Sequence, residues 1–66
     1  MNNNLYNIDG KPFAYIADDG YIYEFNGKVY GYFAGNDIYS LTGSYLGWLS
    51  DGWIYSTSGK AMFYIA

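Results

Sequence analysis

The chain contains no cysteine, no histidine and no arginine. Without cysteine it cannot form disulfides or thiolate metal sites, and without histidine it lacks the commonest transition-metal ligand and general base. Only three lysines oppose six acids, so we expect neither a nucleic-acid partner nor an anionic membrane surface as a partner. No stretch reaches the roughly 18 apolar residues of a membrane-spanning helix.

The chain also has few of the side chains that enzymes use for catalysis. Without His and Cys, proton transfer and nucleophilic attack are left to carboxylates, Lys, Tyr and Ser or Thr. Five of the six acids fall in expected turns, where an Asp side chain stabilises the loop itself. A hydrolase built on paired carboxylates, or a calcium site at Asp18-Asp19-Gly20, is therefore disfavoured. We predict a protein that is not an enzyme, with no catalytic residues, no metal site and no cofactor.

What the chain has in abundance is aromatic side chains and internal repetition. Tyr, Phe and Trp make up 24% of its 66 residues, which we expect to form one domain, 1–66. One motif recurs with its tyrosine at positions 6, 23, 39 and 55. The copies are Leu5-Tyr6-Asn7-Ile8-Asp9-Gly10-Lys11, Ile22-Tyr23-Glu24-Phe25-Asn26-Gly27-Lys28, Ile38-Tyr39-Ser40-Leu41-Thr42-Gly43-Ser44 and Ile54-Tyr55-Ser56-Thr57-Ser58-Gly59-Lys60. Such a period predicts four copies of one supersecondary unit.

Each copy is typical of a β-hairpin, with two β-prone runs on either side of a glycine turn. A three-residue loop in which only the glycine is left-handed fits all four copies better than a two-residue type I′ turn, because Thr42 and Ser58 tolerate positive φ poorly. The first link between hairpins is one residue longer than the next two. We therefore predict an all-β antiparallel meander without helix, of four hairpins at about 5–16, 22–33, 38–49 and 54–65.

Alternation assigns the residues of the second strand of each hairpin to two faces. It places Phe13, Tyr30, Leu46 and Met62 on one face with Tyr15, Tyr32, Trp48 and Tyr64. The opposite face carries Ala14, Gly31 and Gly47, where small residues favour a close backbone approach or room for a neighbouring ring. Phe63 breaks this pattern in the fourth copy. A single hairpin is hardly stable, so the four share a core; a ring around a pseudo-fourfold axis is favoured over a linear stack.

The motif Leu46-Gly47-Trp48-Leu49-Ser50-Asp51-Gly52-Trp53 and the spacing of the glycine turns carry a resemblance that covers about residues 5–65. On these residues the chain resembles the four-fold β-flower domains, small bacterial proteins of uncharacterised function. It implies four hairpin petals around an axis, no known enzymatic activity, and a narrow axial channel able to hold an extended small molecule.

Ten tyrosines exceed what a core favours, because every buried hydroxyl needs a hydrogen-bond partner. Tyrosine rings turned to an axis would satisfy that need and form an amphipathic pocket. We predict a non-enzymatic module that binds an uncharged, elongated ligand, polyether- or glycan-like, in an axial pocket. The ligand-binding residues expected are Tyr6, Tyr23, Tyr39, Tyr55, Tyr15, Tyr32, Trp48 and Tyr64.

The alternative is a structural or self-association domain, a homo-oligomer whose aromatic rings form the core and the subunit interface. The N-terminal residues Met1-Asn2-Asn3-Asn4 lack the basic and apolar regions of a signal peptide, so we expect a cytoplasmic protein as the chain is written.

Overall fold

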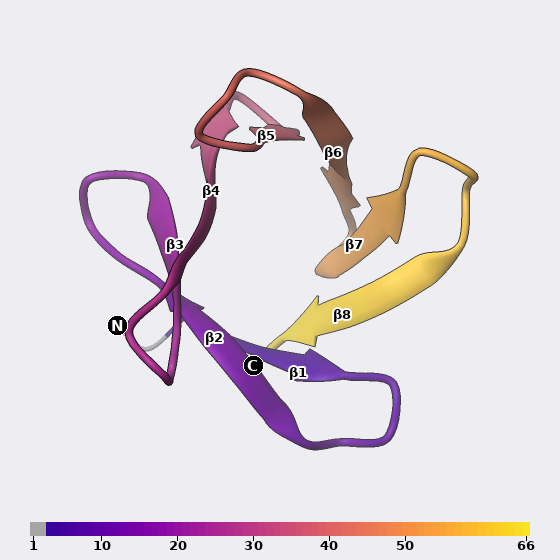
Figure 1. Ribbon diagram of the computed structural model, residues 1–66. Coiled ribbons are helices and arrows are strands. Elements are labelled where there is room, and N and C mark those ends of the chain that lie inside the picture. The colour runs from indigo at the N-terminus through magenta and orange to yellow at the C-terminus, as the bar shows by residue number, and fades with distance from the viewer. Residues whose placement is uncertain (1–2) are drawn as a thin grey trace.

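The computed structural model describes residues 3–66; Met1 and Asn2, which belong to the expected domain and to the polar N-terminal segment, lie outside the described residues. The described part consists of eight antiparallel strands without a helix, as predicted (Figure 1). The strands are β1 (Asn4–Asn7), β2 (Pro12–Ile16), β3 (Tyr21–Glu24), β4 (Val29–Ala34), β5 (Asp37–Tyr39), β6 (Tyr45–Ser50), β7 (Trp53–Ser56) and β8 (Ala61–Ile65). No segment of residues 3–66 forms a helix that could cross a bilayer.

The eight strands close into a barrel in sequence order. The closing contact joins the last strand to the first, with Leu5 opposite Ile65 and Tyr6 opposite Tyr64. The amide of Ala66 extends this ladder by donating to the carbonyl of Asn4 at 3.0 Å. A ring of four hairpins, rather than a linear stack, is therefore the arrangement, and Figure 1 shows the hairpin loops spreading from the ring as petals.

The four hairpin loops form one end of the barrel, here called the tip end (loops 8–10, 25–27, 41–43 and 57–59). Each is a three-residue loop; in the first, the amide of Gly10 donates to the carbonyl of Asn7 and that of Asn7 to the carbonyl of Lys11, both at 2.9 Å. Only the glycine of each loop has a positive φ, between 83° and 92°. The predicted loop geometry is thus confirmed, and it explains why glycine is constant there while the residue before it varies.

The connections between hairpins form the opposite end, here called the link end (17–20, 35–36 and 51–52, with residues 3 and 66 beside them). The first link repeats the three-residue geometry over residues 18–20, with the amide of Gly20 donating to the carbonyl of Ala17. The other two are two-residue turns, and Asp51-Gly52 has positive φ at both residues, as an Asp-Gly hairpin turn requires. The extra residue of the first link is therefore absorbed by a longer loop.

Aliphatic side chains fill the centre of the barrel. Leu5, Ile22, Ile38 and Ile54, which precede the repeated tyrosines, are each at most 1% exposed, and Ala14 is also fully buried. The second strands contribute the half-buried residues that pack against them: Phe13, Ile16, Tyr30, Phe33, Leu46, Leu49, Met62, Phe63 and Ile65. The interior is therefore built mainly from one aliphatic residue per repeat and a surrounding layer from the second strands.

The predicted faces of the second strands are wrong at one position in each copy. Leu5 pairs with Ala14 but Tyr6 with Pro12, so Phe13 is an extra residue at a β-bulge, and the register shifts at the same place in all four hairpins. A bulge turns two successive side chains toward one face. Phe13, and with it Tyr30, Leu46 and Met62, consequently packs against the core instead of sharing the outer face of Tyr15.

The small residues of the second strands mark close contacts, as the sequence predicts. A Cβ placed on Gly47 would lie 1.8 Å from the carbonyl oxygen of Tyr55, and one on Gly31 would lie 2.4 Å from that of Tyr39. Neither glycine can carry a side chain without moving the next hairpin. The fourth copy instead places Phe63 in the interior, where its ring stacks on Phe13 at 4.5 Å.

Candidate functional site

The eight predicted ligand-binding residues lie on the outer wall of the barrel, between neighbouring hairpins. Each repeated tyrosine is directly opposite an aromatic residue of the adjacent hairpin across the strand ladder. The four pairs and their ring-centroid distances are Tyr6–Tyr64 at 5.5 Å, Tyr15–Tyr23 at 5.6 Å, Tyr32–Tyr39 at 5.9 Å and Trp48–Tyr55 at 5.7 Å. All four are stacked, with interplanar angles of 14° to 27°.

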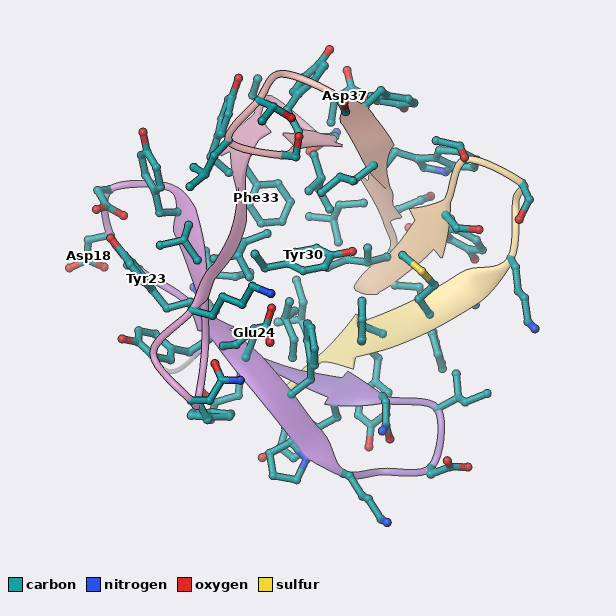
Figure 2. All side chains as sticks on the ribbon, in the orientation of Figure 1. Asp18, Tyr23, Glu24, Tyr30, Phe33 and Asp37 are labelled. Carbon is teal, nitrogen blue, oxygen red and sulfur yellow. The ribbon has the colours of Figure 1, made fainter. Side chains whose placement is uncertain are left out.

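The predicted position of these rings around the axis is therefore wrong. Phe13, Tyr30 and Phe63 occupy the interior, with Tyr30 edge-on to both phenylalanines at 5.4 and 6.0 Å. Figure 2 shows Tyr30 across the centre of the ring, whereas Tyr23 lies outside β3. No pocket opens among residues 3–66. The bulges explain the error, because they supply an inward side chain in each copy and leave the tyrosines to the outer face.

Six rings on β2 to β6, together with Phe25 of the second tip loop, form a continuous series that we call the aromatic strip. Successive centroids are 5.5 to 6.4 Å apart. In order, its members are Phe25, Tyr15, Tyr23, Tyr21, Tyr32, Tyr39 and Tyr45. Four gaps between strands of about 4.8 Å give the strip a length of about 19 Å along the curved sheet.

Three members of the strip, Tyr21, Phe25 and Tyr45, were not among the predicted site residues. Tyr21 could have been found, because alternation from the buried Ile22 places it on the same face as Tyr23. Tyr45 is opposite Tyr39 only because the bulge shifts the register, a feature that alternation does not reveal.

The remaining outer rings form two smaller groups on the other side of the barrel. Trp53 contacts Tyr64 at 5.4 Å and Tyr64 stacks on Tyr6. Trp48 and Tyr55 form the second group. The structure thus divides the eight predicted residues: Tyr15, Tyr23, Tyr32 and Tyr39 belong to the strip, and the other four do not.

Two carboxylates hold phenol groups of the strip. The hydroxyl of Tyr45 donates to Asp37 Oδ1 at 3.0 Å, and that of Tyr23 donates to Asp19 Oδ2 at 3.3 Å. Desolvation by neighbouring atoms, followed by the hydrogen bond and the negative charge of Asp37, raises the pKa of Tyr45. Desolvation, followed by the charge and hydrogen bond of Asp19, raises the pKa of Tyr23 in the same direction. Both phenols are therefore neutral donors near neutral pH.

Inside the barrel, Tyr30 is the one interior tyrosine among the residues packed against the core. Burial raises its pKa above the ordinary value of 10.0, and the negative charge of Glu24 raises it further. Figure 2 shows Glu24 beside Tyr30 near the centre of the view.

Acidic side chains among the described residues also stabilise loops. Asp19 Oδ1 accepts a hydrogen bond from the amide of Tyr21 at 2.9 Å and so closes the first link. Residues 3–66 contain no cluster of three or more His, Cys, Asp or Glu side chains able to hold a metal ion.

These features define an all-β protein: a closed barrel of four pseudo-symmetric hairpins whose outer wall carries most of its aromatic rings. The chain belongs to the family described as 4-fold beta flower protein, whose family model matches residues 3–66. No curated protein and no solved structure is significantly similar to it.

Proposed function

We propose that this chain is a non-enzymatic binding module that holds an uncharged, elongated ligand, a glycan or a polyether, along the aromatic strip on its outer wall. One observation carries the proposal: seven rings follow one another without a gap over five strands. A ligand that lay across them would contact rings from three hairpins.

The chemistry of the strip suits alternating apolar and oxygen-bearing groups. Ring faces and edges offer apolar contact to C–H groups, while phenol hydroxyls exchange hydrogen bonds with ligand oxygens. The hydrogen bonds from Tyr23 to Asp19 and from Tyr45 to Asp37 fix two of these hydroxyls in advance, which lowers the entropy cost of binding. Because these fixed partners are carboxylates, the strip favours neutral ligands over anionic ones.

The binding experiment titrates the protein with neutral cello-, malto- and chito-oligosaccharides of increasing length and with polyethylene glycol, using calorimetry. Affinity should rise with length until the ligand covers the strip. Tyr39→Ala should weaken binding about tenfold, since buried aromatic contacts dominate binding energies.

Tyr55→Ala is the matched control, because Tyr55 has the position of Tyr39 in the next repeat, pairs in the same way and lies off the strip. It should leave affinity unchanged while lowering stability to a similar extent. Equal losses of affinity in the two variants, or no binding to any of these probes, would refute the proposal.

Self-association is a second candidate function, favoured by a different observation. Ile8, Phe25 and Leu41 are more than half exposed at the tip end, at 62%, 55% and 60%. Extended apolar surface exposed on one side of a molecule marks an interaction site, and these three residues share the tip end.

A further inference from the structure

The tip end carries apolar side chains where turns favour polar ones. The first residue of each tip loop is Ile8, Phe25, Leu41 or Thr57, so three of the four are large and apolar. Turn positions usually carry Gly, Asn, Asp, Ser or Pro. The loops do not need these apolar side chains to close, because the backbone bonds and the glycine already close them. Phe25 also contacts the ring of Tyr15 on the outer wall.

All three lysines are at this same end. Lys11, Lys28 and Lys60 directly follow the glycines of the first, second and fourth tips, and Ser44 has the equivalent place in the third. Since the fourth hairpin is beside the first in the closed ring, the three lysines occupy consecutive positions and Ser44 marks a gap.

The link end has the opposite charge. Asp18 and Asp19 belong to the first link, Asp37 follows the second, and Asp51 is in the third. At the fourth place lie residues 3 and 66, which have uncharged side chains. Four acids therefore occupy three consecutive positions of four and give the link end a charge of −4. The tip end has three lysines and two acids, Asp9 and Glu24, and so a net charge of +1. The two ends together account for the net charge of −3 of the chain.

We propose that these barrels associate head to tail, with the tip end of one copy docked on the link end of another. Both ends bear three charged positions and one gap in the same circular order, so a rotation about the axis places Lys60, Lys11 and Lys28 over the first, second and third links. Ser44 then meets residues 3 and 66. The apolar tips reach the half-buried layer at the link end, formed by Ile16, Phe33, Leu49 and Ile65.

A second copy fits this surface because the chain itself supplies both complementary ends. Closure of the barrel leaves no free strand edge, so edge-to-edge pairing is unavailable and only the two ends and the outer wall can form an interface. A small domain without disulfides also gains stability from association. A standard interface buries about 800 Å² per partner, close to a fifth of the 4213 Å² surface of one copy.

Head-to-tail contact is heterologous, because two different surfaces meet. Each added copy leaves one free tip end and one free link end, so growth continues unless the rotation closes a ring. The average mass of the assemblies should therefore rise steadily with protein concentration and should not reach a plateau at the mass of a dimer. High salt should reduce it, since the three lysines and the link-end acids Asp18, Asp19 and Asp51 are exposed.

The polarity of the contact is tested by blocking each end separately. Leu41→Asp blocks the tip end, and Asp18→Lys blocks the link end; both residues are exposed, so the barrel should fold normally, as far-UV circular dichroism would verify. Sedimentation velocity should show each variant alone as a monomer. An equimolar mixture should form a 1:1 dimer and nothing larger, through the intact link end of one variant and the intact tip end of the other.

Thr57→Ser is the control at the equivalent tip, which lacks an apolar side chain, and it should associate like the wild type.

Three results would overturn the head-to-tail proposal. A monomeric wild type at every concentration overturns the proposal, as does an Asp18→Lys variant that still dimerises alone, which would indicate tip-to-tip contact. A monomer that instead co-sediments with vesicles of anionic phospholipid overturns it in favour of a lipid surface. Binding of the neutral oligosaccharides is not at issue in this experiment, because the strip and the barrel ends are tested with different variants.

Discussion

The inner and outer faces of the barrel wall use neighbouring residues of the same strands in different ways. On the inside, Ile38 is 1% exposed and its size is fixed by the residues around it. On the outside, the adjacent Tyr39 is only partly buried and contacts the rings of Tyr32 and Tyr45. The comparison teaches that the small aliphatic interior sets the shape of the barrel. The tyrosines, which can offer both apolar contact and hydrogen bonds, lie on the outer face where a partner can reach them.

The largest expected effect comes from the closest contact of the inner face. Gly47→Ala would place a Cβ 1.8 Å from the carbonyl oxygen of Tyr55, at a φ of +154°. The two strands must separate, so we expect a loss of about 4 kcal/mol or more in the free energy of unfolding, in the exceptional range for one substitution.

Gly59→Ala is the control for the cost of positive φ alone, because its Cβ would meet nothing within 4 Å at a φ of +85°. It should cost about 1–2 kcal/mol. Urea denaturation measures both values, and similar losses in the two variants would show that the close approach at Gly47 is unimportant.

The next effect compares the two faces directly. Ile38→Ala removes a fully buried side chain and should cost about 2–5 kcal/mol. Tyr39→Ala removes a partly buried ring that contacts Tyr32 and Tyr45, and it should cost less than Ile38→Ala, although each outer pair contributes about 0.5–1.5 kcal/mol beyond the burial of its area. Chemical denaturation of both variants gives the difference, and a larger loss at Tyr39 would mean that the outer rings are the true core.

A third effect appears only at alkaline pH. The pKa of Tyr30 is raised in the folded state by burial and by Glu24, so the folded protein keeps its proton more firmly than the unfolded chain. This contribution to stability is complete below the unfolded pKa of 10.0 and is lost as pH rises through the higher folded value. Stability measured against pH should therefore fall less steeply above about pH 10 in Tyr30→Phe than in the wild type. Parallel curves for the two proteins would contradict the interior position of this phenol.

The smallest effect is expected on the outer face. Tyr45→Phe removes the hydroxyl that donates to Asp37 but keeps the ring against Tyr39. Because the bond is exposed to water, the Tm should be unchanged within experimental error. A marked fall in Tm would show that hydrogen bonds of the strip support the fold as well as the surface.

Much of this architecture is predictable from local chemistry. Gly10, Gly27, Gly43 and Gly59 take the left-handed places of three-residue loops because other residues are strained there. The β-prone runs between them leave little alternative to hairpins. The division of the tyrosines between axis and outer wall was not predictable, because a period of two cannot be carried across a bulge such as that at Phe13.

The sequence by itself determined the repeat, the hairpins and their loops, because each depends on residues that are close along the chain. Tertiary structure alone decided that β8 closes on β1, that Tyr30 packs edge-on against Phe63 beside the aliphatic core, and that seven rings form one strip. It also gathered the lysines at one end of the barrel and most of the acids at the other. These features depend on registers between separate hairpins, and such registers are set by the packing of the whole ring.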